Sequence, residues 1–203
     1  MSDKKLDRFI VFEGLDGSGK STQARMLARH LAAQGASVHL TAEPTERAIG
    51  RLVRQALRRD FCTDSRALAL LYAADRSDHL SDPEDGILAH LSRGGTVISD
   101  RYFYSSLAYQ GVSEDEGFLR TINDYPHPET VVFIDTDVRL CLERIDSRGS
   151  GRELFEKEDY LRRVRDNFLR ILTTLPPSVR LVRVDGAASA EEIFSTLLSQ
   201  ISG

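Results

Sequence analysis

Apolar residues follow two alternating patterns along this chain. Short runs that are continuously apolar, or that alternate with polar residues, occur at 9–12, 37–41, 96–99, 130–135 and 180–184. The first run, Phe9-Ile10-Val11-Phe12, is unbroken, as is typical of a strand buried on both faces of a parallel sheet. The segments between the runs place apolar residues at i, i+3, i+4 and i+7, which is one face of a helix. The pattern predicts an α/β fold, a five-stranded parallel sheet with helices on both faces and right-handed crossovers.

The helical segments can be placed from the same spacing. Helices are predicted at 22–31, 49–57, 66–79, 86–91, 138–145, 161–172 and 190–201, with a helical turn at 105–110. In the segment 66–79 the leucines and alanines, among them Leu70 and Ala74, are expected to face the interior. Pro126 and Pro128 are expected to precede the fourth strand. No internal repeat, low-complexity segment or linker is found, so we expect a single domain over residues 1–203.

Composition limits the class of protein. A chain of 203 residues can build one good core, and 41% hydrophobic and 29% charged residues are ordinary for a globular protein. The net charge of -4 gives no overall basic field, so no nucleic-acid partner is expected. Cys62 and Cys141 lack metal-ligand spacing and are interpreted as core thiols in a reducing compartment. Neither a signal-type run after Met1 nor a bilayer-length apolar stretch is found, so we expect a cytoplasmic protein without a membrane partner.

One polar stretch directly follows the first predicted strand. Gly14-Leu15-Asp16-Gly17-Ser18-Gly19-Lys20-Ser21 fits the phosphate-binding pattern G-x-x-x-x-G-K-S/T, and a helix is predicted directly after it. Glycines let the backbone N–H groups surround an anion, and the helix dipole adds positive potential. Lys20 is expected at the surface, reaching the β- and γ-phosphates, and Ser21 is expected to bind Mg²⁺. The predicted ATP-binding residues are Gly14, Leu15, Asp16, Gly17, Ser18, Gly19, Lys20, Ser21 and Thr22.

Charged residues follow the carboxyl ends of two further strands, the edge where open α/β sheets bind ligands. Glu43 follows the second strand, and from spacing alone it fits a ligand-facing acid and a solvated loop acid equally. Asp100 follows the third strand and is a candidate Mg²⁺ ligand. Arg101 beside it could hold a phosphate through two hydrogen bonds. Arg76, among acids near a helix end, is interpreted from spacing alone as a salt-bridge partner.

A phosphate-binding loop names no reaction, so two classes were compared. A GTPase switch calls for an Asp-x-x-Gly turn and an Asn-Lys-x-Asp motif. The stretch Asp100-Arg101-Tyr102-Phe103 does not match the first, and the second is absent. A small-molecule kinase calls for a second phosphate clamp and a cationic lid that excludes water. Arg76, Arg101 and the arginines around Gly149 supply candidates for both, which favours a kinase.

The motifs resemble those of thymidylate kinases nearly from end to end. The resembling segments are residues 12–23, 43–45, 70–76, 99–102 and 105–111. The resemblance implies a three-layer P-loop kinase fold and a homodimer. It also implies an ATP:dTMP phosphotransferase that uses ATP and Mg²⁺ and forms dTDP for dTTP synthesis. The alternatives kept open are a kinase for another nucleoside monophosphate and a nucleotide-binding regulator that hydrolyses ATP as a switch.

The resemblance also implies roles for individual residues. In that family the residues matching Asp16 and Arg101 meet the 3′-hydroxyl and the phosphate of TMP, and the one matching Tyr72 stacks on thymine. Those matching Arg76 and Ser105 lie at the base edge, and the one matching Tyr102 lies beside the sugar. Glu13, Glu43 and Asp100 match positions near the Mg²⁺ and phosphate network. The implied dTMP-binding residues are Asp16, Glu43, Tyr72, Arg76, Arg101, Tyr102, Ser105 and Gln110.

The sequence departs from the family pattern at two positions. Ala42 stands where an arginine is common, so a phosphate contact is either missing or supplied by Arg47 or Arg51. Tyr72 stands where phenylalanine is common. Gly17 occupies a loop position that can carry a catalytic arginine. The catalytic charge is therefore expected from a lid at about 146–156, in Arg148 and Arg152, with Arg152 the stronger candidate. The implied catalytic residues are Lys20, Arg101, Arg148 and Arg152.

Overall fold

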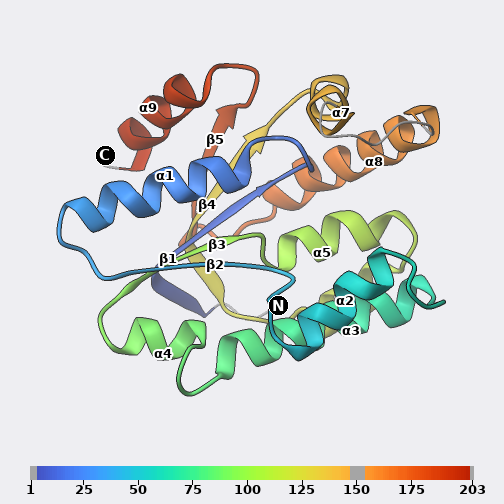
Figure 1. Ribbon diagram of the computed structural model, residues 1–203, viewed down its shortest axis with the longest axis horizontal. Coiled ribbons are helices and arrows are strands. Elements are labelled where there is room, and N and C mark those ends of the chain that lie inside the picture. The colour runs from blue at the N-terminus through green and yellow to red at the C-terminus, as the bar shows by residue number, and fades with distance from the viewer. Residues whose placement is uncertain (1–3, 147–153, 202–203) are drawn as a thin grey trace.

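The computed structural model describes residues 4–146 and 154–201, with side chains from Glu158 onward in the second range. Its centre is the five-stranded, all-parallel sheet that the sequence predicts (Figure 1). The strands lie in the order β2-β3-β1-β4-β5. Their bounds are β1 Lys5–Gly14, β2 Val38–Ala42, β3 Thr96–Asp100, β4 His127–Asp135 and β5 Arg180–Asp185.

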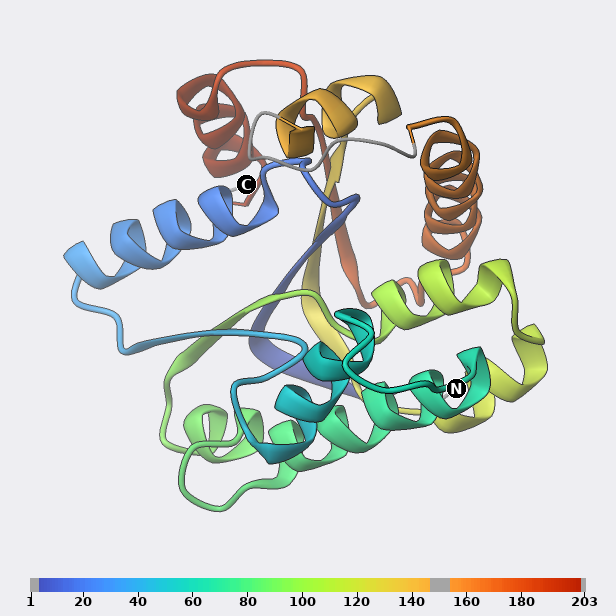
Figure 2. The same ribbon diagram turned by 45° about the vertical axis from the view of Figure 1, so that its right-hand side comes forward.

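Helices cover both faces of this sheet, which gives the three layers expected of the fold (Figure 2). Helices α1 and α9 pack on one face, while α4, α5, α7 and α8 lie on the other. The bounds are α1 Lys20–Ala33, α2 Ala48–Leu57, α3 Ser65–Ser81, α4 Ile87–Ser92, α5 Phe103–Tyr109, the 3₁₀ helix η1 Gln110–Val112, α6 Glu116–Ile122, α7 Val138–Asp146, α8 Leu154–Leu172 and α9 Ala190–Ile201.

The central strand explains why its sequence is continuously apolar. Successive side chains of a strand point to opposite faces, so Phe9 and Val11 enter one core cluster while Ile10 and Phe12 enter the other. All four are at most 7% exposed. Burial of each such side chain contributes roughly 1.5–3 kcal/mol. Both faces of β1 are therefore fixed, and with them the position of the loop that follows Gly14.

Four local predictions differ from the structure. Helix α3 exposes Leu70 and Ala74, and it buries polar residues instead. Pro128 lies within β4 rather than before it. Cys62 is exposed, because it lies in the connection between α2 and α3 and not in the core. The sequence reading also missed α6, a short helix whose N-terminal Asp115 caps it by accepting the Phe118 N–H at 2.8 Å.

Strand register brings the carboxyl ends of β1, β2 and β3 to one edge. Asp100 pairs with both Phe12 and Ala42, so Gly14, Glu43 and Arg101 emerge as neighbours. The strand order also reverses here, because β2 and β3 lie on one side of β1 and β4 and β5 lie on the other. Such a switch point leaves a crevice in which α/β proteins bind ligands. The fold therefore places the three predicted polar segments around one opening.

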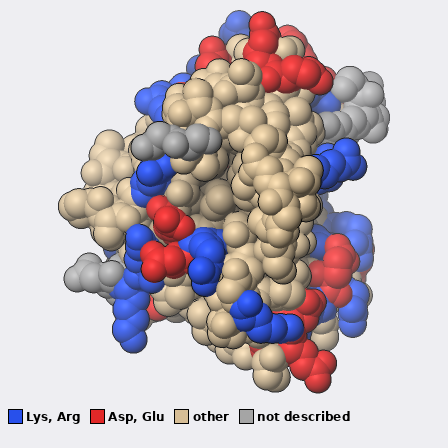
Figure 3. All heavy atoms as spheres, turned by 90° about the vertical axis from the view of Figure 1, so that its left-hand side faces the viewer, with Lys and Arg blue, Asp and Glu red and all other residues tan. Residues whose placement is uncertain are grey.

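Charge is spread over the surface in both signs. Figure 3 shows a face on which acidic and basic side chains lie interspersed. In the described part of the chain, none of the helices combines the length and apolar character needed to cross a membrane. The single domain stays a prediction. The lid at about 146–156 also stays a prediction, because residues 147–153 lie outside the described residues. The last three residues of the predicted lid, 154–156, begin helix α8.

Candidate active site

The phosphate-binding loop connects β1 to α1 through backbone that only glycine adopts easily. Gly17 has φ +82°, and Gly19, which precedes α1, has φ +101°. A Cβ on Gly17 would lie 2.5 Å from the Cys141 carbonyl oxygen of α7. Backbone conformation and close packing therefore both exclude a side chain at this position. An arginine cannot enter the loop here without moving α7.

Lys20 is buried rather than at the surface as expected, with 5% of the residue exposed. Its ammonium donates to the Leu15 carbonyl oxygen at 2.7 Å, which folds the side chain back over the loop. Burial lowers the pKa of Lys20 to about 8, and the nearby Arg101 charge acts in the same direction. An anion bound in the loop would offset both effects, so the buried charge suits a phosphate ligand.

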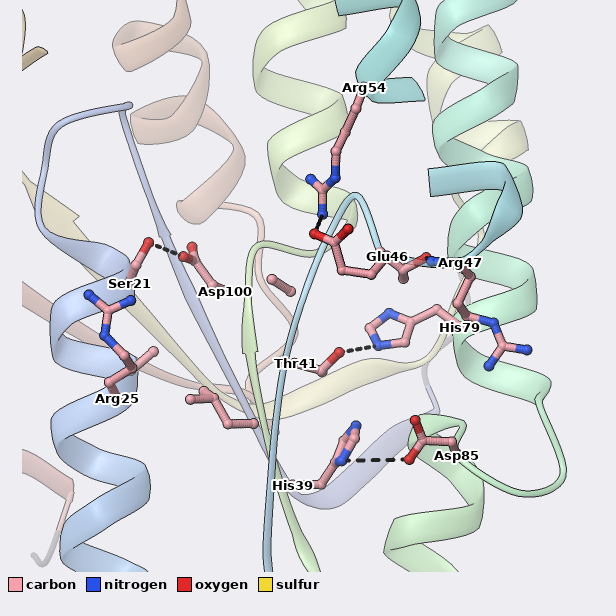
Figure 4. Close-up of a pocket in the computed structure, with 14 residues that line it drawn as sticks. Ser21, Arg25, His39, Thr41, Glu46, Arg47, Arg54, His79, Asp85 and Asp100 are labelled. Atoms are coloured by element: carbon pink, nitrogen blue, oxygen red, sulfur yellow. Dashed lines mark hydrogen bonds and ion pairs between the residues drawn. The ribbon is translucent and has the colours of Figure 1, made fainter. Parts of the chain in front are cut away.

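Ser21 and Asp100 meet across the strand edge. The Ser21 hydroxyl donates to Asp100 Oδ2, a contact drawn in Figure 4. The other oxygen, Asp100 Oδ1, is buried without a hydrogen-bond partner among the described residues. Buried carboxylate oxygens are rarely left in that state. A hydroxyl and a carboxylate beside the loop form the oxygen donor set that Mg²⁺ prefers, so these residues fit the ion.

Arg101 links the loop to α5. Its guanidinium pairs with Asp16 Oδ1 at 2.6 Å, donates to Ser105 Oγ at 2.8 Å and lies over the Tyr109 ring, 4.9 Å from its centroid. The Arg101 charge lowers the pKa of Asp16 to about 2. Arg101 itself has φ +78°, a conformation that is rare outside glycine and that marks functional sites. The Arg101 guanidinium is therefore held beside the phosphate-binding loop by Asp16, a residue of that loop.

Glu13, on β1, binds the residues at the start of α5. Its carboxylate accepts the Tyr102 N–H at 2.9 Å and the Ser105 hydroxyl at 2.6 Å. Complete burial raises the pKa of Glu13 to about 7. Tyr102 is also fully buried, and its hydroxyl donates to the Pro126 carbonyl at 3.2 Å. Glu13 thus fixes the segment from Arg101 to Ser105 from inside the protein.

Glu43 and Arg76 form a buried ion pair. Glu43 is 4% exposed, which excludes the solvated loop acid, and its Oε2 lies 2.8 Å from Arg76 Nε. The same guanidinium donates to Asn123 Oδ1 and to Ser106 Oγ. On the other side His79 Nδ1 lies 3.1 Å from Glu43 Oε1. Arg76 pairs with Glu43 and not with its helical neighbours, so α3 uses this residue to hold the end of β2.

A cavity of about 290 Å³ opens between the loop, α3 and α5. It is lined by all eight residues implied for dTMP, which are Asp16, Glu43, Tyr72, Arg76, Arg101, Tyr102, Ser105 and Gln110. Gln110 Oε1 is buried without a partner among the described residues, so it is available to a ligand. The volume and the mixture of aromatic and charged walls fit one nucleotide-sized molecule.

The wall of this 290 Å³ cavity also contains residues that the sequence did not predict. Tyr109, Leu57, Leu68 and Tyr160 line the same cavity. Tyr109 is the most informative of them, because its hydroxyl accepts the Asp16 N–H at 3.0 Å and the Arg101 Nη2–H at 3.3 Å. Its position within the family-like segment 105–111 was the sequence signal that could have identified Tyr109 as a site residue. The leucines and Tyr160 carried none, since amphipathic spacing does not distinguish a cavity wall from a core.

A second cavity of about 420 Å³ runs along β2 between α1 and α3 (Figure 4). Asp100 and Ser21 lie on one of its walls, and Arg47 and His79 come from the opposite side. Among the described residues, Arg54 is the one that lines both cavities. The Mg²⁺ candidates and the dTMP candidates thus lie on adjoining openings.

Arg47 and Arg51, the two arginines expected to make up for Ala42, both have partners within the protein. Arg47 pairs with Asp78 on α3 and with Asp82 directly after it, and Arg51 Nη1 donates to the Glu46 carbonyl at 2.7 Å. Neither lines the cavity of the dTMP candidates, whereas Arg54 does. Arg54 Nε is moreover buried without a partner among the described residues. Arg54 Nη2 is itself paired with Glu46 Oε1 and donates to the Pro44 carbonyl, both at 2.6 Å, so the role expected of Arg47 or Arg51 stays a prediction.

Arg148 and Arg152 lie outside the described residues, so their predicted catalytic role stays a prediction. Arg144, on the last turn of α7, is described, and its Nη1 lies 3.5 Å from the Gly17 carbonyl oxygen. The last turn of α7 therefore lies beside the phosphate-binding loop.

Comparison with known proteins agrees with this geometry. The sequence profile of the family described as "Thymidylate kinase" matches residues 12–196. A "Putative thymidylate kinase" of Treponema pallidum is 38% identical over 200 residues, 97% of this chain and 95% of the relative. A "Probable thymidylate kinase" of Pyrococcus horikoshii is 40% identical over 200 residues, 95% of each. The profile match over most of the chain and the identity to these relatives show that the chain belongs to the thymidylate kinase family.

Proposed function

We propose that the protein transfers the γ-phosphoryl group of ATP to the 5′-phosphate of dTMP, giving dTDP and ADP for dTTP synthesis. The observation that carries the proposal is the cavity that joins the eight implied dTMP residues and opens beside the phosphate-binding loop. ATP would occupy the loop residues 14–22. The acceptor would lie in the cavity with its phosphate at Arg101 and its base toward Tyr72 and Arg76.

Transfer of this kind needs alignment and charge neutralisation more than covalent chemistry. The acceptor phosphate is already ionised, so the site needs no strong general base. Lys20 and the loop N–H groups would hold the donor phosphates, and Arg101 would hold the acceptor phosphate. Asp16 and Tyr109 keep Arg101 in place before a substrate arrives, which lowers the cost of ordering it on binding.

Ser21 and Asp100 are the residues that would hold Mg²⁺. Bound there, the ion would neutralise charge on the phosphate oxygens. The unpartnered Asp100 Oδ1 and the adjacent Ser21 hydroxyl support this assignment. We further propose a cytoplasmic homodimer, as the family resemblance implies. Light scattering measures the assembly, and a mass of one chain, 22.7 kDa, would contradict a dimer.

A panel of nucleoside monophosphates tests the proposed reaction. ADP release should depend on dTMP, with dUMP second and UMP, dCMP and dAMP poor acceptors. Loss of the thymine methyl costs only roughly 1–3 kcal/mol, so rejection of dUMP should be partial. Equal kcat/KM for dCMP or dAMP would reject the base-site assignment. ATP turnover that is indifferent to every monophosphate would favour the regulator instead.

Removal of the loop lysine should abolish most transfer. Lys20→Ala should lower kcat/KM for ATP by roughly 10²–10³, because a buried charge directed at the phosphates is lost. Lys20→Met is the matched variant, since it keeps the apolar stem in the same buried space. Circular dichroism checks that both variants fold. Near wild-type activity of a folded variant would contradict the role of the loop.

Activity should also fall on the alkaline side. Protonated Lys20 is the form that binds phosphates, and its pKa in the free protein is about 8. As the pH rises through about 8 the cation is lost, so kcat/KM for ATP should decrease, whereas kcat should hold to higher pH because bound phosphates stabilise the ammonium. Lys20→Arg should lack this limb in its residual activity, since the guanidinium stays charged. A flat kcat/KM up to about pH 9.5 would contradict the assignment.

Arg54 should supply the acceptor contact for which Ala42 offers no charge. Arg54→Ala should raise KM for dTMP by about 10–100-fold, because a charged donor to the acceptor is removed. Arg51→Ala, three residues earlier on α2 and outside the cavity, is the control and should change KM little. Equal effects of the two substitutions would show that charge on α2, not a contact, is responsible.

The predicted lid arginines should contribute to kcat. Gly17 offers no side chain at the loop, and an arginine at the transferring group is worth about 10³–10⁵ in rate. The Arg148→Ala/Arg152→Ala double variant should therefore lower kcat by at least about 10³ while changing KM for dTMP little. If the double variant keeps wild-type kcat, the lid is not the source. Arg144→Ala then tests the described arginine beside Gly17.

A further inference from the structure

Two histidines and an aspartate gather outside the proposed catalytic site. His39 lies on β2, Asp85 in the turn before α4, and His90 on α4. Figure 4 shows His39 and Asp85 facing one another at the end of the β2 cavity away from Asp100. We call these three residues the histidine cluster. Neither the phosphate-binding loop nor the dTMP cavity uses any of them.

One carboxylate oxygen is the centre of the cluster. Asp85 Oδ1 lies 2.9 Å from His90 Nε2 and 4.0 Å from His39 Nδ1. The two imidazole rings stack with their centroids 3.8 Å apart and their planes 12° apart. One donor atom from each of the three residues falls within 4.8 Å of both others. A single ion could therefore reach all three.

These separations are close to those around tetrahedral zinc. Bonds of about 2.0–2.1 Å at tetrahedral angles put neighbouring donor atoms about 3.3 Å apart. The widest separation in the cluster exceeds this by at most about 1.5 Å. The Asp85 side chain is 71% exposed and can rotate, whereas the two stacked rings, whose planes are 12° apart, must tilt for both to point a nitrogen at one ion.

The backbone that carries the cluster is fixed without a ligand. Asp82 accepts the N–H groups of Glu84 at 3.0 Å and Asp85 at 2.7 Å, which shapes the turn. The His90 carbonyl accepts the Gly95 N–H at 3.1 Å, and His39 pairs with Val97 in the sheet. Such support around candidate ligands lowers the cost of ordering them when an ion binds.

The charge states also suit a metal ligand. Burial and the neighbouring His90 lower the pKa of His39, which favours its neutral ring. The hydrogen bond from His90 lowers the pKa of Asp85, which stays ionised. Neutral imidazole and ionised carboxylate are the forms that bind metal ions. Two imidazoles with one carboxylate favour zinc and similar transition metals over Mg²⁺ or Ca²⁺, which prefer oxygen donors.

We propose that His39, Asp85 and His90 form a Zn²⁺ site, with the fourth position open to water or to a small ligand in the β2 cavity. Three protein ligands and an open position are the arrangement of accessible zinc sites. The proposal is independent of the proposed phosphotransfer, because it uses none of the residues assigned to that reaction.

Calorimetric titration of Zn²⁺ into the full chain tests the site. Every protein carries Cys62→Ser, which removes an exposed thiol that would compete for zinc. Excess Mg²⁺ is present to occupy the oxygen ligands at Asp100. We expect one Zn²⁺ per chain, with affinity at least about tenfold lower in His39→Ala and in His90→Ala. His30→Ala removes a histidine on α1 that bonds Gln34, so it is the matched control and should bind as wild type.

Two further readouts make the result decisive. Zn²⁺ at about 100 times its Kd should raise Tm by roughly 5–10 °C in the wild type and not in the cluster variants. If a histidine variant fails to fold, Asp85→Ala decides by the same criterion, because that side chain is mostly exposed. Wild-type affinity in the cluster variants, or no wild-type binding up to about 100 µM, would overturn the proposal.

Discussion

The buried ion pair between Glu43 and Arg76 is the interaction on which the proposed acceptor site depends. It joins the end of β2 to α3, and through Ser106 and Asn123 the same guanidinium holds α5 and the end of α6. Removing one partner of such a pair typically costs about 3–5 kcal/mol, because the other is left charged and dry. The pair forms part of the cavity wall, so structure and proposed recognition share these two side chains.

A second constraint operates at the phosphate-binding loop. Gly17 packs against the Cys141 carbonyl, which brings α7 to the loop and leaves room only for backbone. The contact orients the N–H groups of the loop, but it also removes the position from which a loop arginine could act. Packing of this one glycine against α7 thus excludes an arginine side chain at this loop position.

Charge in this site is prepared before substrate binds. Arg101 is paired with Asp16 and supported by Tyr109, while Lys20 is folded back onto Leu15. Both cations lie in partly or wholly buried surroundings, where an electrostatic interaction is stronger than in water. The Asp16 carboxylate and the Leu15 carbonyl hold the two cations in the structure, and under the proposed function a phosphate would replace those contacts. The thymidylate kinase family membership and the geometry are consistent with this arrangement.

The sequence by itself determined the sheet and the phosphate-binding loop, and its family motifs named eight of the residues that line one cavity. Those features rest on local periodicity and on motifs, which act within one strand, one turn or one helix. Only the tertiary structure decided that Lys20 is buried, that Arg76 pairs with Glu43, and that α3 buries polar residues where Leu70 is exposed. It also brought Arg54, and neither Arg47 nor Arg51, to the wall of this cavity. Burial and pairing depend on neighbours that lie far apart along the chain, and no local pattern records which side chains the fold will bring together.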